Sequence, residues 1–326
     1  MSELRFDPLV GDWVMIAANR QARPQMPKDW CPFCPGSGKV PEDYDVLMYP
    51  NDFPALSKDA VAAEETGSEL LKSAPAYGKC EVILYSPDHH ATLGDLSVAH
   101  IGKLVHLWRD RFVEISRDEK IKYVMIFENR GKEVGVTMPH PHGQIYGYSW
   151  VPKKLALESA SFADYAAAHG GRCLMCDMLA AEAADGRRLL FENEHFMVFL
   201  PYFTQYPYGI YIGAKMHKQN LAQMDESELS SLAAILKRAV GMLDSLYGFP
   251  FPYMMCMHQN PVNCGKEKDF HFHIEFFPPL RSEKVMKYNA SSETGAWAHC
   301  NPTSPEEKAA ELRAADARFL GGQHAE

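Results

Sequence analysis

One supersecondary unit occurs twice in this chain, and this repeat restricts the possible folds more than any other feature of the sequence. Each copy contains, in order, a Cys-x-x-Cys pair, a strand, a second strand that leads to a histidine, a helix, a further strand and a His-x-His stretch. The first copy runs from Cys31 to His142 and the second from Cys173 to His273. The shared order indicates an internal duplication. We therefore expect two halves, residues 1–152 and residues 153–326.

Composition places the chain among globular proteins and disfavours some kinds of partner. Of its 326 residues 46% are hydrophobic, and the net charge is -9. An acidic chain is a poor candidate for non-specific binding to nucleic-acid backbone, although a few local donors suffice for a small anionic substrate. The N-terminal residues lack the features of a signal peptide, and no apolar run reaches the roughly 18 residues of a membrane span. We expect a cytoplasmic protein that binds neither nucleic acid nor membrane.

The cysteines point to metal binding rather than to disulfides. There are eight of them, and a disulfide framework is not expected in a cytosolic chain of this size. The segment from Cys31 to Gly36, with the sequence CPFCPG, is typical of a zinc knuckle, in which proline and glycine turn both sulfurs toward one point. A thioredoxin-type redox pair is the alternative. Such a pair opens a helix, and Pro35-Gly36 argues against one here.

Each half offers four Cys and His ligands, which is the set that a structural zinc ion takes. Some positions leave a choice. His89 and His90 are adjacent in the first half, and His258, His273 and Glu275 compete for the site in the second half. Because a complete set leaves no open coordination position, both ions are expected to be structural. The candidate ligands are Cys31, Cys34, His89 or His90, and His140 in the first half, and Cys173, Cys176, His217 and His271 in the second.

Two histidines lie two residues apart in the stretch Met138-Pro139-His140-Pro141-His142-Gly143-Gln144. The prolines favour an extended chain, and both imidazoles then project from one face. If His140 binds the metal, His142 can act as a neutral nucleophile whose tautomer is fixed by a backbone carbonyl. Gly143 would leave room for a phosphate to approach the backbone. The Gln144 amide can donate to a phosphoryl oxygen without acting as an acid, which suits transfer to a second substrate rather than hydrolysis.

The second copy differs at the positions where chemistry would occur. It has Ile274-Glu275 where the first copy has Gly143-Gln144. We therefore predict that the first copy is active and that the second is largely scaffold.

Apolar periodicity predicts a helix at residues 96–115, and Ala-rich composition with a Gly170-Gly171 stop predicts one at residues 153–171. Capping signals predict a helix at residues 225–247 and a last helix that begins at Ser304. Asp225 is the expected N-cap of its helix, with Glu228 at the third helical position. We expect one strand over residues 6–16, a mobile polar insertion at residues 57–79 and a loop at residues 277–297.

Short motifs of a recognisable kind occur along nearly the whole chain. They are Asp7-Pro8-Leu9, Arg20 with Arg23-Pro24, Cys31 with Cys34-Pro35-Gly36, Asn51-Asp52-Phe53, Ser86-Pro87-Asp88-His89, Phe127-Glu128-Asn129-Arg130-Gly131, His140-Pro141-His142-Gly143-Gln144 and Pro278-Pro279-Leu280-Arg281-Ser282. In this combination the chain resembles the galactose-1-phosphate uridylyltransferases, a family of the histidine-triad superfamily.

The resemblance implies an α+β fold of two histidine-triad-like halves, mainly antiparallel sheet with packed helices. It implies a ping-pong reaction of galactose metabolism, the Leloir pathway. His142 would attack the α-phosphate of UDP-glucose, release glucose-1-phosphate and form a uridylyl-histidine, from which galactose-1-phosphate takes the uridylyl group. The resemblance also favours His89 over His90 as a ligand of a structural Zn²⁺, of which each half would hold one.

The resemblance further implies which residues meet the substrates. Two would lie near the uridine and several near the phosphates, where the loop arginines are suited to clamp oxygen atoms in pairs. Two more would reach the hexose phosphate from the partner chain of a homodimer with shared active sites. The residues predicted to bind uridine are Asn51 and Asp52. Those predicted near the phosphates are Arg20, Arg23, Asn129, Thr137 and Gln144. Those predicted to come from the partner chain are Lys287 and Glu293.

Some positions depart from the family pattern. Gly135-Val136-Thr137-Met138 stands where many members have Gly-Cys-Ser-Asn, and Ser291-Ser292-Glu293-Thr294 differs from the commonest version of its loop. In the family a Glu/His cluster of the second half can hold iron, whereas the Cys173/Cys176 pair favours zinc. The alternatives are an ADP-sugar or dinucleotide phosphorylase of the same superfamily and a zinc-stabilised nucleotide-binding protein without activity. A nucleic-acid-binding zinc module is disfavoured by the acidic charge.

Overall fold

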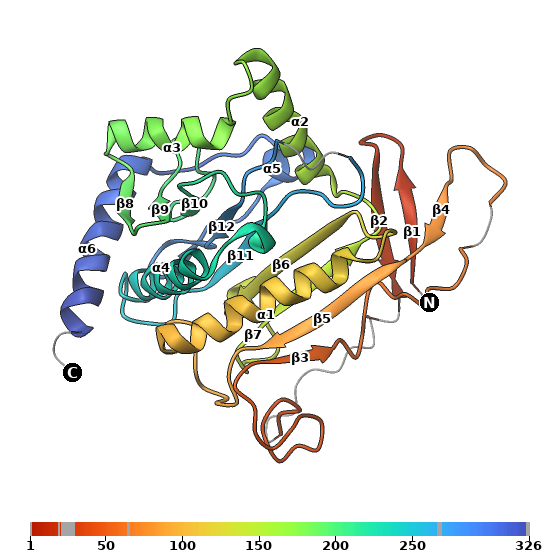
Figure 1. Ribbon diagram of the computed structural model, residues 1–326, viewed down its shortest axis with the longest axis horizontal. Coiled ribbons are helices and arrows are strands. Elements are labelled where there is room, and N and C mark those ends of the chain that lie inside the picture. The colour runs from red at the N-terminus through yellow and green to blue at the C-terminus, as the bar shows by residue number, and fades with distance from the viewer. Residues whose placement is uncertain (1, 19, 21–29, 64–65, 266–268, 324–326) are drawn as a thin grey trace.

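A nine-stranded antiparallel sheet forms the centre of the protein (Figure 1). The computed structural model describes residues 2–18, 20, 30–63, 66–265 and 269–323. In spatial order the strands of this sheet are β3 (Leu47–Pro50), β5 (Gly78–Leu84), β7 (His142–Tyr148), β6 (Tyr123–Arg130), β11 (Tyr253–His258), β12 (His273–Phe277), β10 (Tyr211–Ala214), β9 (Phe196–Phe199) and β8 (Leu189–Glu192).

The strand order shows the duplication directly. From the edge inward, the first half has the order β3, β5, β7, β6, and the second half has an additional edge strand, β8, followed by β9, β10, β12 and β11. Both halves therefore place the first, second, fourth and third strands of the repeated unit side by side. The two units meet where β6 pairs with β11, with Arg130 opposite Tyr253 and Ile126 opposite Met257. The predicted α+β fold with two duplicated halves and a mainly antiparallel sheet is confirmed.

Two smaller sheets and six helices complete the described structure. The smaller sheets are β2 (Asp12–Ala17), β1 (Ser2–Asp7) and β4 (Ser73–Pro75), and the hairpin of β13 (Leu280–Ser282) and β14 (Val285–Met286). The α-helices are α1 (Val98–Ser116), α2 (Lys153–Ala168), α3 (Leu174–Asp185), α4 (Glu226–Asp244), α5 (Ser291–Ala296) and α6 (Pro305–Gln323), with short 3₁₀ turns at Lys132–Val134 and Leu221–Gln223.

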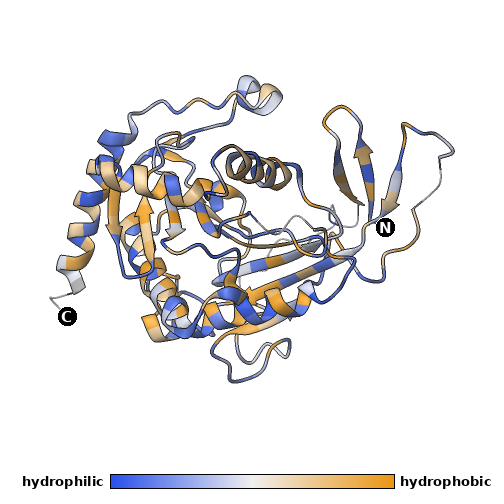
Figure 2. Cartoon of the chain, turned by 45° about the horizontal axis from the view of Figure 1, so that its top comes forward, coloured by the Kyte–Doolittle hydropathy of each residue, from blue (hydrophilic) through white to orange (hydrophobic). Residues whose placement is uncertain are grey.

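Helices α1 and α4 lie side by side and cover the same face of the large sheet (Figure 1). The buried positions of α1 include Leu104, Trp108 and Phe112, which follow the predicted helical period. The predicted capping box of α4 is present, because Asp225 and Glu228 each accept a backbone N–H of the other. The main core lies between these helices and the sheet, whose strands are largely apolar (Figure 2).

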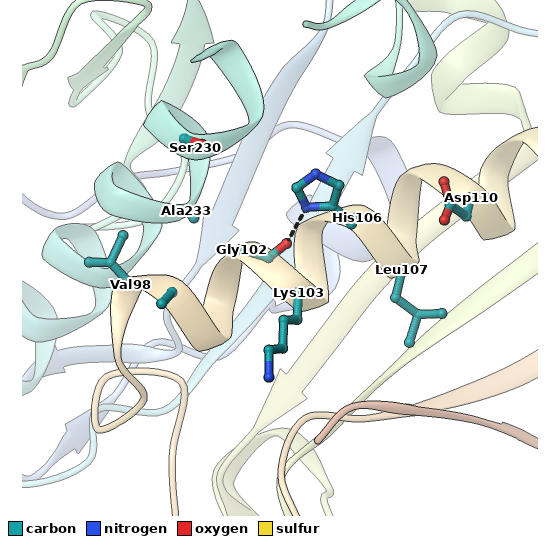
Figure 3. Close-up of a pocket in the computed structure, with 9 residues that line it drawn as sticks. Val98, Gly102, Lys103, His106, Leu107, Asp110, Ser230 and Ala233 are labelled. Carbon is teal, nitrogen blue, oxygen red and sulfur yellow. Dashed lines mark hydrogen bonds between the residues drawn. The ribbon is translucent and has the colours of Figure 1, made fainter. Parts of the chain in front are cut away.

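The outer surfaces of α1 and α4 border an open groove (Figure 3). His106 of α1 donates from Nδ1 to the Gly102 carbonyl at 2.7 Å, and its Nε2 lies 2.6 Å from a carboxylate oxygen of Glu226, the first residue of α4. The Gly102 carbonyl and Glu226 together raise the pKa of His106. The contact therefore adds a polar link between the two halves on the helical side.

Some local expectations were wrong. The expected strand at residues 6–16 is a hairpin, since a turn separates β1 from β2. The expected insertion at residues 57–79 contributes β4 to the small sheet. Residues 277–297, expected to form a loop, contain the β13–β14 hairpin and α5. Helix α3 was not expected from the sequence. Among the described residues, no helix combines the length and apolar character that crossing a membrane requires.

An ion pair joins the last residue of β6 to the end of α4, and its removal tests how strongly the two halves are coupled. Arg130 donates two hydrogen bonds to the Asp244 carboxylate, both at 2.9 Å, and its side chain is 9% exposed. Asp244→Asn leaves a buried guanidinium without its counter-charge. We expect a loss of about 2 kcal/mol in urea unfolding, below the value for a fully buried pair because Asp244 is partly exposed. Glu114→Gln, which removes an exposed pair with Arg117, should leave the transition unchanged.

Candidate functional site

The predicted ligands of the first half converge on one point. Cys31, Cys34, His89 and His140 have their ligand atoms within 4.8 Å of one another. The Sγ to Nδ1 distances are 3.4 Å from Cys34 to His89 and 3.7 Å from either cysteine to His140. Zinc–sulfur and zinc–nitrogen bonds at tetrahedral angles would separate these atoms by about 3.6 Å. The geometry therefore fits a zinc ion, and it brings in His89 rather than His90.

Hydrogen bonds and burial prepare His140 to bind a metal through Nδ1. Its Nε2–H donates to the Ser86 carbonyl at 2.8 Å, which leaves the lone pair on Nδ1, the nitrogen that faces the sulfurs. Burial lowers the pKa of His140 to about 4, so the ring is neutral at physiological pH. Burial and the neighbouring Cys31 raise the pKa of Cys34 to about 11. Without a cation the thiol would keep its proton, and a bound metal would displace it.

The second half repeats this arrangement. Cys173, Cys176, His217 and His271 form a second group within the same limit of 4.8 Å. The Nδ1 of His271 lies 3.3 Å from the Cys173 sulfur and 3.5 Å from that of Cys176, and its Nε2–H donates to the Ala214 carbonyl at 2.8 Å. Burial lowers the pKa of His271 to about 3 and raises that of Cys176 to about 12. The donor set again suits zinc.

The residues that had been expected to compete for the second site form a group of their own. His258, His273 and Glu275 gather with Glu158 of α2. The competition predicted from the sequence was therefore wrong, because the Cys/His set and the Glu/His set occupy different places. Glu158 was missed, since nothing in its sequence surroundings links the α2 helix to β11 and β12. The ammonium of Lys154, one turn earlier in α2, lies against Glu275 and supplies a positive charge to this group.

The tautomer of His142 is fixed as expected. Its Nδ1–H donates to the carbonyl of His140 at 2.7 Å, so the lone pair is on Nε2. The ring of Phe33, whose centroid lies 5.9 Å from that of His140 and 6.2 Å from that of His142, packs beside both imidazoles. His142 begins β7, and Gln144, two residues on, projects from the same face of the strand.

The second copy contains the same hydrogen bond but not the same exposure. His273 donates from Nδ1 to the His271 carbonyl at 2.9 Å. It is 3% exposed, stacks on Tyr211, and its Nε2 lies 3.6 Å from Glu275, whereas His142 is half-buried. A substrate has access to the first histidine and not to the second, which agrees with a scaffold role for the second copy.

The space next to Gly143 is filled by protein. A Cβ atom at this position would lie 2.2 Å from the hydroxyl oxygen of Tyr85 and 3.0 Å from the Phe127 carbonyl oxygen. The glycine is thus required by close packing between β7 and Tyr85. The expected approach of a phosphate along this direction is not available.

A pocket of about 300 Å³ opens beside His142. Its walls come from the middle of the loop before α1, from the end of β6, and from the segment that leads into β7. Among its lining residues are the predicted phosphate-binding residues Asn129 and Thr137, together with Glu128. The structure therefore places two predicted substrate-binding residues and the predicted nucleophile around one cavity.

The other predicted residues of the first half lie on neighbouring elements. Arg20 contacts Tyr146, which lies on the same face of β7 as Gln144. Asn51 and Asp52 follow β3 directly, and Asp52 accepts a hydrogen bond from Tyr49. Tyr49 in turn packs against Phe33 beside the imidazoles. Arg23 lies outside the described residues.

Lys287 and Glu293 lie together in the C-terminal segment. Their side chains form an ion pair at 2.5 Å, and both are buried. The Lys287 ammonium also lies over the ring of Tyr206, and the Glu293 carboxylate accepts the backbone N–H groups of Ala290 and Cys300. Lys287 lowers the pKa of Glu293 to about 2. In the described part of one chain, this pair contacts the C-terminal segment and Tyr206, and neither residue lines the pocket beside His142.

Loss of one ligand should remove one metal ion. We expect Cys34→Ser and Cys173→Ser each to lower the zinc content by about one equivalent per chain, because three remaining ligands bind more weakly than four. The content is measured by plasma mass spectrometry of the purified chain. Cys300→Ser, at an exposed cysteine outside both groups, is the matched control and should keep the full content. Unchanged zinc in Cys34→Ser would contradict the assignment of the first group.

Comparisons with known proteins point in one direction. The profile described as galactose-1-phosphate uridyl transferase, N-terminal domain, matches residues 1–152, and that of the C-terminal domain matches residues 158–317. A galactose-1-phosphate uridylyltransferase of Thermotoga maritima is 38% identical over 96% of this chain and 98% of its own length. The enzyme of Haemophilus influenzae is 33% identical over 87% of this chain and 86% of its own length.

Solved structures give the same result. A structure described as a uridylyltransferase superposes with a TM-score of 0.89 at 31% identity, over 98% of this chain and 99% of that one. An ADP-glucose phosphorylase from Arabidopsis thaliana, solved with bound ADP-glucose, has a TM-score of 0.74 at 26% identity, over 96% and 98% of the two chains. The similarity to the uridylyltransferase is the greater of the two.

Proposed function

The chain belongs to the galactose-1-phosphate uridylyltransferase family, and from this premise we propose that it transfers the uridylyl group of UDP-glucose to galactose-1-phosphate through His142. The observation that carries the proposal is the hydrogen bond from His142 Nδ1 to the His140 carbonyl. It leaves the lone pair on Nε2, the nitrogen that would attack phosphorus, while His140 itself belongs to the Cys/His group.

The reaction has two steps that use the same nitrogen. In the first, His142 Nε2 forms a bond to the α-phosphorus, and the bond from this phosphorus to the oxygen of glucose-1-phosphate breaks. In the second, a phosphate oxygen of galactose-1-phosphate attacks the same phosphorus, and the bond to Nε2 breaks. The leaving group of each step is a weakly basic phosphate or imidazole, so neither step requires a strong acid. An amide at position 144 is sufficient to stabilise the phosphoryl oxygens.

The chain's other residues would bind and orient the substrates. We assign the phosphates to Arg20, Arg23, Asn129, Thr137 and Gln144, and the uridine to Asn51 and Asp52. Amide and hydroxyl donors stabilise charge on phosphoryl oxygens, and guanidinium groups pair with two oxygens at once. The positions of Asn129 and Thr137 in the pocket beside His142 support their part of this assignment.

The metal groups would hold the backbone that carries the nucleophile. Cys31, Cys34, His89 and His140 would bind one Zn²⁺, and Cys173, Cys176, His217 and His271 a second. A zinc ion with four protein ligands has no open position for a substrate, and its contribution is structural. It fixes His140, whose carbonyl in turn fixes the ring of His142.

Replacement of the nucleophile should abolish the reaction. We expect His142→Asn to lower kcat by about a thousandfold or more and to prevent the gain of one uridylyl mass on incubation with UDP-glucose. His106→Asn, in α1 and not among the residues that line the pocket beside His142, is the matched control and should keep both. The adduct is detected by intact mass spectrometry and located by peptide mapping.

The same assay separates the family activity from its main alternative. The similarity to an ADP-glucose phosphorylase makes ADP-glucose the relevant competing donor. An adenylyl adduct in the absence of a uridylyl adduct would overturn the proposal. Nucleotide binding without any adduct would indicate the inactive binding protein instead.

We also propose a homodimer in which Lys287 and Glu293 of one copy complete the active site of the other. Such a shared site would require the Lys287–Glu293 ion pair to rearrange or to become accessible to the second copy. The proposal can be tested by mixing two inactive variants, His142→Asn and Lys287→Ala. If sites are shared, each mixed dimer has one intact site, and random mixing restores about one quarter of the native activity. If each site lies within one chain, mixing restores no activity.

A further inference from the structure

A group of buried polar side chains lies behind the strand that carries His142. Glu128 lies in β6, two residues before its end, and its carboxylate accepts a hydrogen bond from the Tyr253 hydroxyl at 3.2 Å. Glu128 is 5% exposed, and Tyr85 and Tyr253 are fully buried. The site residues proposed above do not include these three. A buried carboxyl beside an active-site pocket requires a physical explanation, because burial disfavours its charged form.

Tyr85 connects this group to the backbone of the nucleophile's strand. Its hydroxyl fills the space in which Gly143 lacks a Cβ, and its backbone N–H donates to the Pro141 carbonyl at 3.0 Å. Within the described residues its hydroxyl has no partner at hydrogen-bond geometry. Glu128 is nevertheless close enough to raise the pKa of Tyr85 further, after burial itself. A small rotation of either side chain would therefore satisfy a buried donor that now lacks an acceptor.

The charges around Glu128 leave it without a dedicated counter-ion. Arg130 is the nearby cation, but it makes its two hydrogen bonds to Asp244. Tyr85 and Tyr253 contribute hydroxyl groups only. Burial raises the pKa of Glu128 to about 7, against the opposing effect of Arg130. Near neutral pH the carboxyl thus exchanges between its uncharged and charged forms.

Glu128 also lies at the wall of the catalytic pocket. Its neighbour Phe127 pairs with Gln144 of β7, and its other neighbour is Asn129. Glu128 and His142 line the same cavity. A negative charge here acts through a poorly screened interior on any anion that enters. The sugar nucleotide and the hexose phosphate are both anions.

We propose that Glu128 is a positioning residue of the transfer reaction. Its carboxyl, through Tyr85, holds the Gly143 backbone between His142 and Gln144, and the negative charge of its ionised form opposes the entry of substrate phosphates. The inference rests on the proposed uridylyl transfer and adds a control by proton concentration at a residue that does not touch the reacting atoms.

The charge part of the inference is tested by Glu128→Gln, which keeps the shape and removes the charge. In the unaltered chain, kcat/KM for glucose-1-phosphate release from UDP-glucose should fall at least about fivefold between pH 7 and pH 8.5, as Glu128 ionises. Glu128→Gln should lack this alkaline fall. Glu133→Gln removes an equal charge from an exposed side chain of the neighbouring turn and should retain it.

The positioning part is tested by Tyr85→Phe, which leaves the carboxyl in place. We expect kcat to fall several-fold with little change in KM, and the alkaline fall to remain. Tyr85→Phe also tests the positioning role if Glu128→Gln does not fold. An alkaline fall that persists in Glu128→Gln, or an unchanged kcat in Tyr85→Phe, would overturn the inference. Failure of the proposed function looks different, because the unaltered chain would then form no uridylyl adduct at any pH.

Discussion

The hydrogen bonds of two imidazole N–H groups, those of His140 and His142, determine which ring nitrogens carry lone pairs at the site. His140 gives its Nε2–H to the Ser86 carbonyl, so that Nδ1 faces the thiols, and His142 gives its Nδ1–H to the His140 carbonyl, so that Nε2 carries the lone pair. His140, just before β7, and His142, its first residue, are thereby set in opposite tautomers. The Cys/His group and the proposed nucleophile are linked, because the carbonyl that orients the His142 ring belongs to His140, a member of that group.

The duplicated half contains the same hydrogen-bond pattern in a different setting. His271 and His273 make the same two hydrogen bonds. In that half, however, Glu275 and Tyr211 enclose the second imidazole. Gln144 occupies the position that Glu275 holds in the repeat, and the pocket beside His142 remains open. The difference between the copies lies in what surrounds the ring and not in how the ring is held.

Much of this could be predicted from the sequence, because the informative contacts follow a repeated local pattern. The Cys/His groups follow from spacing and duplication, and the capping box of α4 from Asp225 and Glu228, three residues apart. What could not be predicted depends on tertiary approach. Glu158 joins His258 only because α2 folds back on the second half. The need for glycine at position 143 comes from Tyr85, a distant residue in the sequence. Helix α5 has six residues, too few for periodicity to reveal, and Glu293 accepts the backbone N–H at its start.

The pairing of β6 with β11 also has a consequence for synthesis of the chain. Residues 123–130 emerge from the ribosome long before residues 253–258, which hydrogen-bond to them in the finished sheet. Until then β6 is an edge strand with unpaired backbone groups, and such edges are prone to pair with other chains. The first half alone would therefore be a hazard for aggregation, and the second half serves as the intramolecular cover of that edge.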